Sequence, residues 1–202
     1  MYLGKDAIHR PPMLEPSDDE LMRAAGAGDR AAFGTLVARH LQRMSGLAGR
    51  ITGNRGDAEE IVQEAFLRAW LKAPTWLGRE DRTGGAAFGT WLGRVVVNLC
   101  LDRKRKAVPL PIEAAAEVAD PTPDGFAAAA GSEVAARVAQ AMATLPDRQR
   151  AAIALCHYEG LSNIEAAAML DVTVGALESL LVRARKSLRA ALVDLAPEGS
   201  PR

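Results

Sequence analysis

Two clusters of positively charged side chains carry the clearest chemistry in this sequence. Four consecutive cations occupy Arg103–Lys106, and four more fall within seven residues between Arg183 and Arg189. Guanidinium and ammonium groups at this density can neutralise the phosphates of a nucleic-acid backbone. The first cluster also lies where a helix is expected to end, and cations stabilise the negative end of a helix dipole. For Arg103–Lys106 both explanations stay open.

The residue types needed for catalysis or metal binding form no recognisable group. The chain has 202 residues, with two cysteines, Cys100 and Cys156, and three histidines that are far apart. Neither set has the spacing of a zinc site, and no phosphate-binding loop of the G-x-x-x-x-G-K-[ST] type occurs. We therefore expect no enzyme activity, no metal, no cofactor and no small-molecule substrate. Cys100 falls on an apolar helix face, where we expect a small buried hydrophobe.

The composition favours an all-α protein. Aromatic residues make up 4% of the chain and hydrophobic residues 49%, and much of the latter is alanine and leucine, which favour helices. No apolar run of about 18 residues occurs, so no membrane insertion is expected. Residues 1–16 lack the apolar stretch of a signal peptide. We expect a cytoplasmic protein in which residues 1–16 are disordered.

The charges divide the chain into two parts joined by a different kind of segment. Residues 107–136 contain five acidic residues and no Lys or Arg, although the formal net charge of the whole chain is zero. Prolines in the same stretch break helices and stiffen an extended chain. We interpret 107–131 as an acidic, proline-rich linker between small helical domains over 17–106 and 132–196, followed by a tail over 197–202. A surface loop within one domain is the alternative.

The first half begins with two capped helices. Ser17–Glu20 has the pattern of a capping box at the start of a short helix. Asp29 is a suitable N-cap for the next helix, whose apolar residues recur at helical spacing. A turn is expected over Thr52–Gly56.

Two longer helices follow in the first half. In Asp57–Trp70, with Asp57 as the expected N-cap, an apolar stripe is opposed by a charged face, which solvation alone would explain. Pro74 is expected to end this helix. The stripe over Phe88–Cys100 is the strongest of this half, and its helix leads directly into Arg103–Lys106.

The second half has the pattern of a helix-turn-helix. A helix is expected from Pro146 to Gly160, and Ser162 opens a second capping box before a short alanine-rich helix over Asn163–Leu170. After a tight turn, Thr173 caps a longer helix that runs to about Leu195 and has a basic outer face. This arrangement is typical of DNA-binding modules. An ordinary helical hairpin with a solvated face is the alternative.

In this order, the segments resemble the extracytoplasmic-function (ECF, group IV) sigma factors of the sigma-70 family over about residues 18–195. Asp57–Trp70, with the sequence DAEEIVQEAFLRAW, resembles the polymerase-binding helix of that family. Phe88–Asn98, together with Asp102–Arg105, resembles its −10-reading and promoter-melting helix. Leu145–Ser162 and Val174–Arg189 resemble its −35-binding domain. The resemblance implies a bacterial transcription initiation factor that directs core RNA polymerase to promoters.

The resemblance also implies partners and residue roles. The partners are core RNA polymerase, through the β′ clamp helices and the β flap, promoter DNA, and an anti-sigma factor acting in a stress response. Polymerase contacts are implied for Asp57, Glu60, Gln63, Glu64 and Arg68. Contacts to −10 DNA are implied for Arg79, Arg82, Arg94, Asn98, Asp102, Arg103, Lys104, Arg105 and Lys106, and contacts to −35 DNA for Thr173, Gly175, Glu178, Ser179, Val182, Arg183 and Lys186.

Glu178 departs from the family's commonest pattern, in which a basic residue stands at this position. A carboxylate in the first turn of the second helix can accept a hydrogen bond from cytosine N4. It also stabilises the positive end of the helix dipole, which is the structural alternative.

Two other classes of protein compete with this interpretation. A helix-turn-helix regulator that does not join polymerase leaves the motifs at 57–70 and 88–106 unexplained. An all-helical adaptor predicts no salt-dependent binding of DNA.

Overall fold

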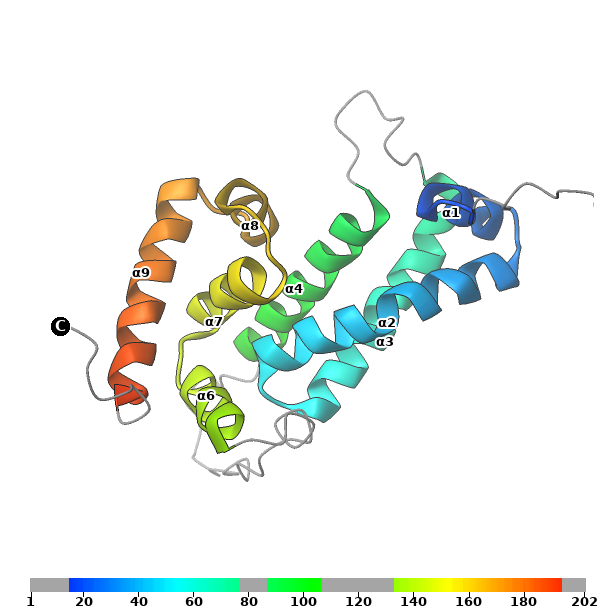
Figure 1. The fold of residues 1–202 in the computed structure, drawn as a ribbon. Helices are drawn as coiled ribbons and strands as arrows, with labels where there is room; N and C mark the ends of the chain where they lie inside the picture. Colours follow the sequence, from blue (N-terminus) through cyan, green and yellow to red (C-terminus); the bar gives the residue numbers. More distant parts are fainter. Residues whose placement is uncertain (1–14, 77–86, 107–132, 194–202) are drawn as a thin grey trace, which may run out of the picture.

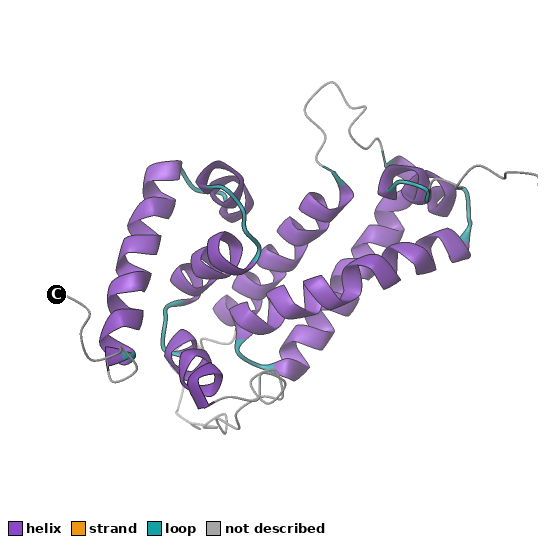
Figure 2. Ribbon diagram, in the orientation of Figure 1, coloured by secondary structure: helices purple, strands orange, loops and turns teal. Residues whose placement is uncertain are grey.

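The protein is helical throughout the part of the chain that the structure covers. The computed structural model describes residues 15–76, 87–106 and 133–193, and within these ranges no strand occurs (Figures 1 and 2). The expected all-α class is therefore confirmed. The helices are α1 (Asp18–Gly26), α2 (Arg30–Thr52), α3 (Arg55–Lys72), the 3-10 turn η1 (Ala73–Thr75), α4 (Phe88–Lys106), α6 (Glu133–Ala143), α7 (Asp147–Ile153), the π-helical turn η3 (Ala154–Tyr158), α8 (Asn163–Leu170) and α9 (Val174–Ala191).

The first two expected N-caps form as the sequence indicates. Ser17 and Glu20 make a complete capping box, in which the Glu20 carboxylate accepts a hydrogen bond from the Ser17 backbone N–H at 2.7 Å. That backbone bond and the Ser17 hydroxyl lower the pKa of Glu20. The Asp29 carboxylate accepts the N–H groups of Ala31 and Ala32 at the start of α2. Both caps satisfy donors that a helix start otherwise leaves unpaired.

The expected N-cap of α3 was wrong. Asn54 caps this helix, because its side-chain oxygen accepts the Asp57 N–H at 2.9 Å and Asp57 already lies inside the first turn. The turn is also shorter than expected, since α2 continues through Thr52 and ends where Gly53 adopts a left-handed φ of 69°. Asparagine is as good an N-cap as aspartate, so local propensity alone did not separate the two.

The expected apolar stripes form the core of the α1–α4 bundle. In α3 the buried stripe runs from Ala58 to Ala69, and in α4 it includes Phe88, Leu92, Val96 and Cys100, with Cys100 only 1% exposed. Val97 joins this core although the sequence pattern did not single it out. The helix α3 ends at Lys72. The 3-10 turn η1 follows it directly and ends at the exposed Thr75.

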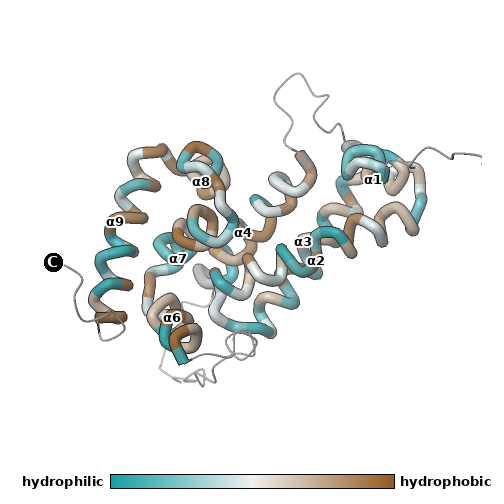
Figure 3. The backbone as a smooth tube through the Cα atoms, in the orientation of Figure 1, coloured by the Kyte–Doolittle hydropathy of each residue, from teal (hydrophilic) through white to brown (hydrophobic). Residues whose placement is uncertain are grey.

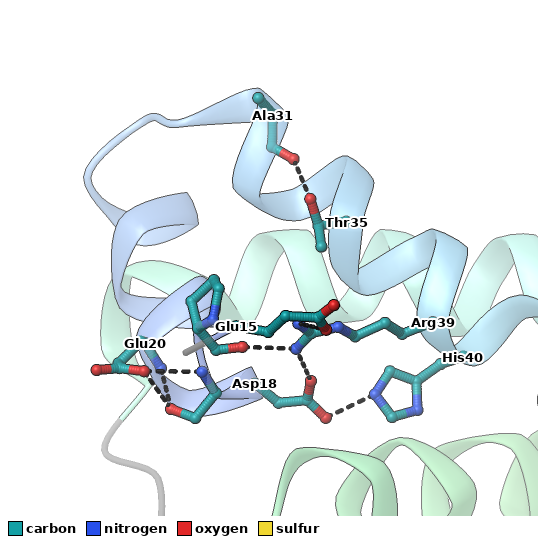
Figure 4. Close-up of polar contacts among 9 residues, drawn as sticks. Glu15, Asp18, Glu20, Ala31, Thr35, Arg39 and His40 are labelled. Carbon is teal, nitrogen blue, oxygen red and sulfur yellow. Dashed lines mark hydrogen bonds and ion pairs between the residues drawn. The ribbon is translucent and has the colours of Figure 1, made fainter. Parts of the chain in front are cut away.

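The contact between α1 and α2 fixes the start of the described chain (Figure 4). Arg39 of α2 donates to the Pro16 carbonyl at 2.7 Å and pairs with Asp18 at 3.1 Å, and Nε2 of His40 lies 2.7 Å from the second Asp18 oxygen. Glu15 also pairs with Arg39, at 3.3 Å. The expectation of disorder over residues 1–16 is therefore wrong for its last two residues, and residues 1–14 lie outside the described ranges.

The second group of helices contains one that the sequence pattern did not indicate. α6 precedes α7 as an alanine-rich helix. The expected helix from Pro146 begins at Asp147 and changes to π geometry over Ala154–Tyr158. α8 has the expected bounds, and α9 ends at Ala191, earlier than expected. The linker proposed for 107–131 and the tail over 197–202 lie outside the described ranges.

The two groups of helices pack against each other. α7 contacts α2 and α4, and α8 contacts α4, whereas α9 lies on the far side of α7 and α8 from the first bundle (Figure 1). One cluster of buried apolar side chains extends through both groups.

Candidate nucleic-acid interface

The outer face of α9 presents the residues that the sequence assigned to −35 DNA. Thr173 caps the helix by accepting the Ala176 N–H at 3.2 Å, and Leu177, Leu181 and Ala184 anchor the opposite face in the core. Because this apolar stripe fixes the rotation of the helix, the intervening residues face outward. All seven are exposed: Thr173, Gly175, Glu178, Ser179, Val182, Arg183 and Lys186. Hydrophilic and hydrophobic residues alternate along α9 in Figure 3.

α8 and the turn after it set the direction in which α9 leaves. The Ser162–Glu165 capping box forms as expected, and the Ser162 hydroxyl and backbone N–H lower the pKa of Glu165. α8 ends at Asp171, the one described non-glycine residue with a positive φ, at 53°. Aspartate tolerates this left-handed conformation better than most residues. The turn therefore brings α9 across α8 within two residues.

Glu178 has a local partner in the structure. The side-chain amide of Asn163, the first residue of α8, donates to its carboxylate at 3.4 Å, and both side chains are exposed. A long, exposed hydrogen bond of this kind is weak. The carboxylate at the start of α9 thus stays available to a base edge.

The outer face of α4 is only partly available. Arg94, Asn98 and Asp102 recur at intervals of four residues and all are exposed. The Arg94 guanidinium, however, donates to the carbonyl of Ala168 near the end of α8. Of the other residues assigned to −10 DNA, Lys104, Arg105 and Lys106 continue α4, and Arg79 and Arg82 lie outside the described ranges.

The charged face of α3 carries the residues assigned to polymerase. The Glu60 side chain is 66% exposed, Gln63 is exposed, and Glu64 pairs with Arg68 one turn later at 2.9 Å. Leu67 and Leu71 extend the same face and are 52% and 69% exposed. Sequence reasoning missed these two leucines, although they continue from Gln63 at intervals of four residues and lie off the buried stripe.

Arg103 joins two surfaces that the sequence kept apart. Its guanidinium lies 2.7 Å from Asp57 and 2.6 Å from Glu60, both on α3. Hydrogen bonding to Glu60 and the two negative charges raise the pKa of Arg103. A cation assigned to −10 DNA is therefore paired with two acids assigned to polymerase.

Two other kinds of feature are absent from the described residues. Within those ranges, no three His, Cys, Asp or Glu side chains lie together as metal ligands. None of the described helices is long and apolar enough to cross a bilayer.

A helix-turn-helix with an exposed cationic second helix, beside a helical bundle with a polar outer face, defines a two-part helical DNA-binding protein. Family models agree with this division. Sigma-70 region 2 matches residues 36–108, and Sigma-70, region 4 matches residues 135–188.

Curated and solved proteins give the particular family. The ECF RNA polymerase sigma factor SigM of Mycobacterium tuberculosis is 39% identical over 177 residues, which cover 86% of this chain and 84% of SigM. The structure of CnrH in complex with the cytosolic domain of CnrY is 30% identical, with a TM-score of 0.61 over 90% of this chain and 100% of that one. The sigma factor RpoE of Bartonella quintana, solved with the anti-sigma factor NepR, shares the fold at 24% identity and a TM-score of 0.59, covering 80% of this chain and 96% of that one. The chain belongs to the ECF RNA polymerase sigma factors of the sigma-70 family.

Proposed function

We propose that this transcription initiation factor binds core polymerase through the outer face of α3. Asp57, Glu60, Gln63, Glu64 and Arg68 supply the polar contacts, and Leu67 and Leu71 add apolar area to the same face. An exposed surface that combines carboxylates, an amide and leucines fits a basic partner helix with an apolar stripe, such as the β′ clamp helices. The domain of α6–α9 sits on the β flap in the same complex.

Promoter reading is divided between the two groups of helices. α9 enters the −35 major groove, with Arg183 reading a base edge and Lys186 holding a phosphate. α4 meets the −10 region through Arg94, Asn98, Asp102 and the cations from Arg103 to Lys106. The single observation that best supports this division is that the six assigned residues of α9 are exposed on one face, next to the exposed cap Thr173, while the opposite face is buried.

Strand separation in this proposal needs no nucleotide hydrolysis and no catalytic group. Unstacking one base costs a few kcal/mol, and contacts to the flipped base recover this cost. Asn98 is exposed on α4 and carries both a donor and an acceptor for such a base. Arg79 and Arg82 are further residues assigned to −10 DNA, and they lie outside the described ranges. The protein is thus a binding factor and not an enzyme.

Location and control follow from the same role. The protein works with polymerase in the cytoplasm and responds to a stress or environmental signal. An anti-sigma factor covers its polymerase-binding surfaces until that signal arrives, as the complex of the Bartonella protein with NepR suggests.

The direct test is run-off transcription with purified core polymerase and a library of genomic promoter fragments. The wild-type protein should start transcripts at a defined set of promoters that share −35 and −10 sequences. Gln63→Ala combined with Glu64→Ala should weaken core binding about tenfold or more, because it removes two polar contacts from the proposed polymerase-binding face. The circular dichroism spectrum should stay unchanged, because both residues lie off the buried stripe.

A matched control separates this effect from a general loss of polar surface. Gln42→Ala with Glu133→Ala removes the same two residue types from exposed positions on α2 and α6. Core affinity should stay at the wild-type value. Equal affinities for the two double variants would refute the assignment of α3 as the polymerase-binding helix.

A further inference from the structure

Asn163 and Glu178 place an amide and a carboxylate side by side on the surface of α8 and α9. Nδ2 of Asn163 donates to Oε1 of Glu178 at 3.4 Å, and both residues are exposed. Glu178 lies one residue before Ser179 and one turn before Val182, which are both assigned to −35 DNA. Asn163 has no assigned role from the sequence. The structure therefore adds a second polar group, from a different helix, beside the carboxylate.

Neither of these two side chains caps its own helix. The Ser162–Glu165 capping box already serves the start of α8, and Thr173 caps α9. Glu178 is the fifth residue of α9, and the first turn of this helix contains no acidic residue, so the position expected from the sequence was wrong. The effect of the helix dipole on a carboxylate falls off within the first turn. The dipole therefore contributes little to the reason for a carboxylate at this position.

The Cys156 thiol determines which end of the Asn163 amide faces Glu178. The sulfur lies 4.0 Å from the Asn163 side-chain oxygen, to which the thiol donates. Burial raises the pKa of the Cys156 thiol, although the positive charge of Arg185 opposes this shift, so the thiol keeps its proton at neutral pH. A carboxylate only accepts hydrogen bonds. With a donor at its oxygen and an acceptor at its nitrogen, the amide has one favoured orientation.

We propose that Glu178 and Asn163 together read one C·G base pair of the −35 element. The inference rests on the proposed function, which places α9 in the −35 major groove. On the major-groove edge of C·G, the cytosine N4 amino group donates and the neighbouring guanine O6 accepts. Glu178 accepts the free N4–H, and Asn163 donates its second N–H to O6.

The spacing of the two protein atoms suits this base pair. N4 and O6 belong to one Watson–Crick hydrogen bond, so they lie about 2.9 Å apart. Nδ2 of Asn163 and Oε1 of Glu178 are 3.4 Å apart. The protein thus presents an acceptor beside a donor at nearly the distance at which C·G presents a donor beside an acceptor. All four atoms keep a partner when the two pairs meet.

The second carboxylate oxygen of Glu178 distinguishes C·G from the base pair that resembles it most. A·T also presents a donor, adenine N6, beside an acceptor, thymine O4. Adenine carries a further acceptor, N7, next to N6, where cytosine has only a C–H group. A carboxylate oxygen that faces N7 has no proton to share with it, and such an unpaired contact is costly. G·C and T·A reverse the order of donor and acceptor, so C·G is the favoured pair.

Isosteric exchanges of amide and carboxylate test the pair without changing its shape. Glu178→Gln and Asn163→Asp each remove one half of the pattern. The double variant Asn163→Asp/Glu178→Gln keeps the net charge and one amide opposite one carboxylate, but it exchanges the donor and the acceptor. Glu133→Gln, at the exposed start of α6, makes the same change of charge as Glu178→Gln and serves as the control.

The experiment uses holoenzyme assembled from the full chain and purified core polymerase. Selection from a promoter library randomised across the −35 element gives the preferred sequence, and competition between duplex promoter fragments that differ at one base pair gives the affinity ratios. Wild type and Glu133→Gln should prefer C·G at one position by about tenfold or more. Each single variant should reduce this preference to about threefold or less. The double variant should prefer G·C at that position, because G·C presents acceptor and donor in the reverse order.

Every outcome separates this inference from the proposed function. Ratios between base pairs are compared, so a uniform rise in DNA affinity after loss of a negative charge leaves them unchanged. Base preferences of Glu178→Gln or Asn163→Asp that equal those of the wild type overturn the inference. A double variant that still prefers C·G also overturns it, because the pair then only joins α8 to α9. In these cases run-off transcription continues, whereas a wild-type protein that directs polymerase to no promoter refutes the proposed function itself.

Discussion

Two cations of α9, Arg183 and Lys186, and two cations of α4, Arg94 and Arg103, are arranged in opposite ways. On α9, the structure records no ion pair or hydrogen bond for the side chains of Arg183 and Lys186 within the described ranges, and both are exposed. On α3 and α4, Arg103 is held by two carboxylates and Arg94 by a backbone carbonyl. Under the proposed assignments, the −35 surface is available to DNA in the free protein, whereas Arg94 and Arg103 of the −10 surface must first exchange internal partners for external ones.

In the proposed function, the two surfaces assigned to DNA therefore differ in how many of their cations already have partners within the protein. A free cation contributes fully to phosphate neutralisation, because it leaves only counterions and water. A paired cation must give up its partner first, so its net contribution to binding is smaller. Substitutions on the two surfaces should therefore have unequal effects.

Arg150→Ala tests a buried residue that joins the two groups of helices on which these surfaces lie, and its effect should be the largest. The substitution leaves the carbonyls of Ile51 and Ala143 without their donor, so we expect a loss of about 3 kcal/mol in unfolding free energy. Urea denaturation followed by circular dichroism measures it. Arg148→Ala, at an exposed position on the same helix, should cost less than about 0.5 kcal/mol. Equal losses for the two would contradict the role of Arg150.

Arg183→Ala and Lys186→Ala test the free surface. Arg183→Ala should cost about 1–3 kcal/mol of DNA-binding free energy and relax selectivity at one −35 position, if the Arg183 guanidinium makes two hydrogen bonds to one base. Lys186→Ala should weaken binding equally across sequences and reduce the slope of log affinity against log salt by about one. Salt titrations on selected and scrambled −35 duplexes measure both quantities, and the reverse pattern would exchange the two roles.

Arg103→Ala tests the paired surface. Because its side chain and those of Asp57 and Glu60 are all partly exposed, we expect a loss of less than about 1 kcal/mol in unfolding free energy. Binding of −10 DNA should fall less than it does for Arg94→Ala. Fluorescence anisotropy with a single-stranded −10 oligonucleotide measures the affinity of each variant. A larger loss of affinity for Arg103→Ala than for Arg94→Ala would show that the ion pairs of Arg103 with Asp57 and Glu60 break readily.

Glu165→Gln should have the smallest effect, and it depends on pH. Hydrogen bonds from the Ser162 hydroxyl and backbone N–H hold the pKa of Glu165 below the ordinary value of a glutamate. Its contribution to stability is therefore complete above the unfolded-state pKa and is lost as the pH falls through the lower folded-state pKa. The melting temperatures of wild type and Glu165→Gln should accordingly converge as the pH falls from 6 towards 3. In a Ser162→Ala background this convergence should disappear. If it persists, an interaction other than the Ser162 hydrogen bonds causes the pH dependence.

Local signals in the sequence predicted much of the fold. The two capping boxes, the Thr173 cap and the bounds of α8 depend on residues within a few positions of one another, so the sequence pattern was sufficient for them. α6 was missed although Ser132, a residue type favoured at N-caps, directly precedes Glu133 in the sequence. Asn54 was missed because Asp57, three residues later, has the same propensity.

The parts of the site that depend on tertiary contacts could not be predicted in this way. The assigned α9 residues face outward because a periodic apolar stripe fixes the rotation of the helix. The pairing of Arg103 with α3, the contact of Arg94 with α8 and the burial of Arg150 all join residues 40 or more positions apart. No spacing within a single helix encodes these contacts, so an arginine that binds another helix is indistinguishable in sequence from one that faces solvent.

The contacts of Arg150 with the Ile51 carbonyl and of Arg94 with the Ala168 carbonyl form a junction within one covalent chain, and that fact sets how it responds to concentration. Residues 107–132 separate α4 from α6, and a chain of this length reaches at most about 90 Å when fully extended. Tethered partners of this kind meet at an effective concentration on the order of millimolar. Diluting the protein therefore leaves the junction closed, and a competitor in solution gains little by mass action alone. A partner that binds both groups of helices at once gains from the same covalent link, because its second contact is also made at this high effective concentration.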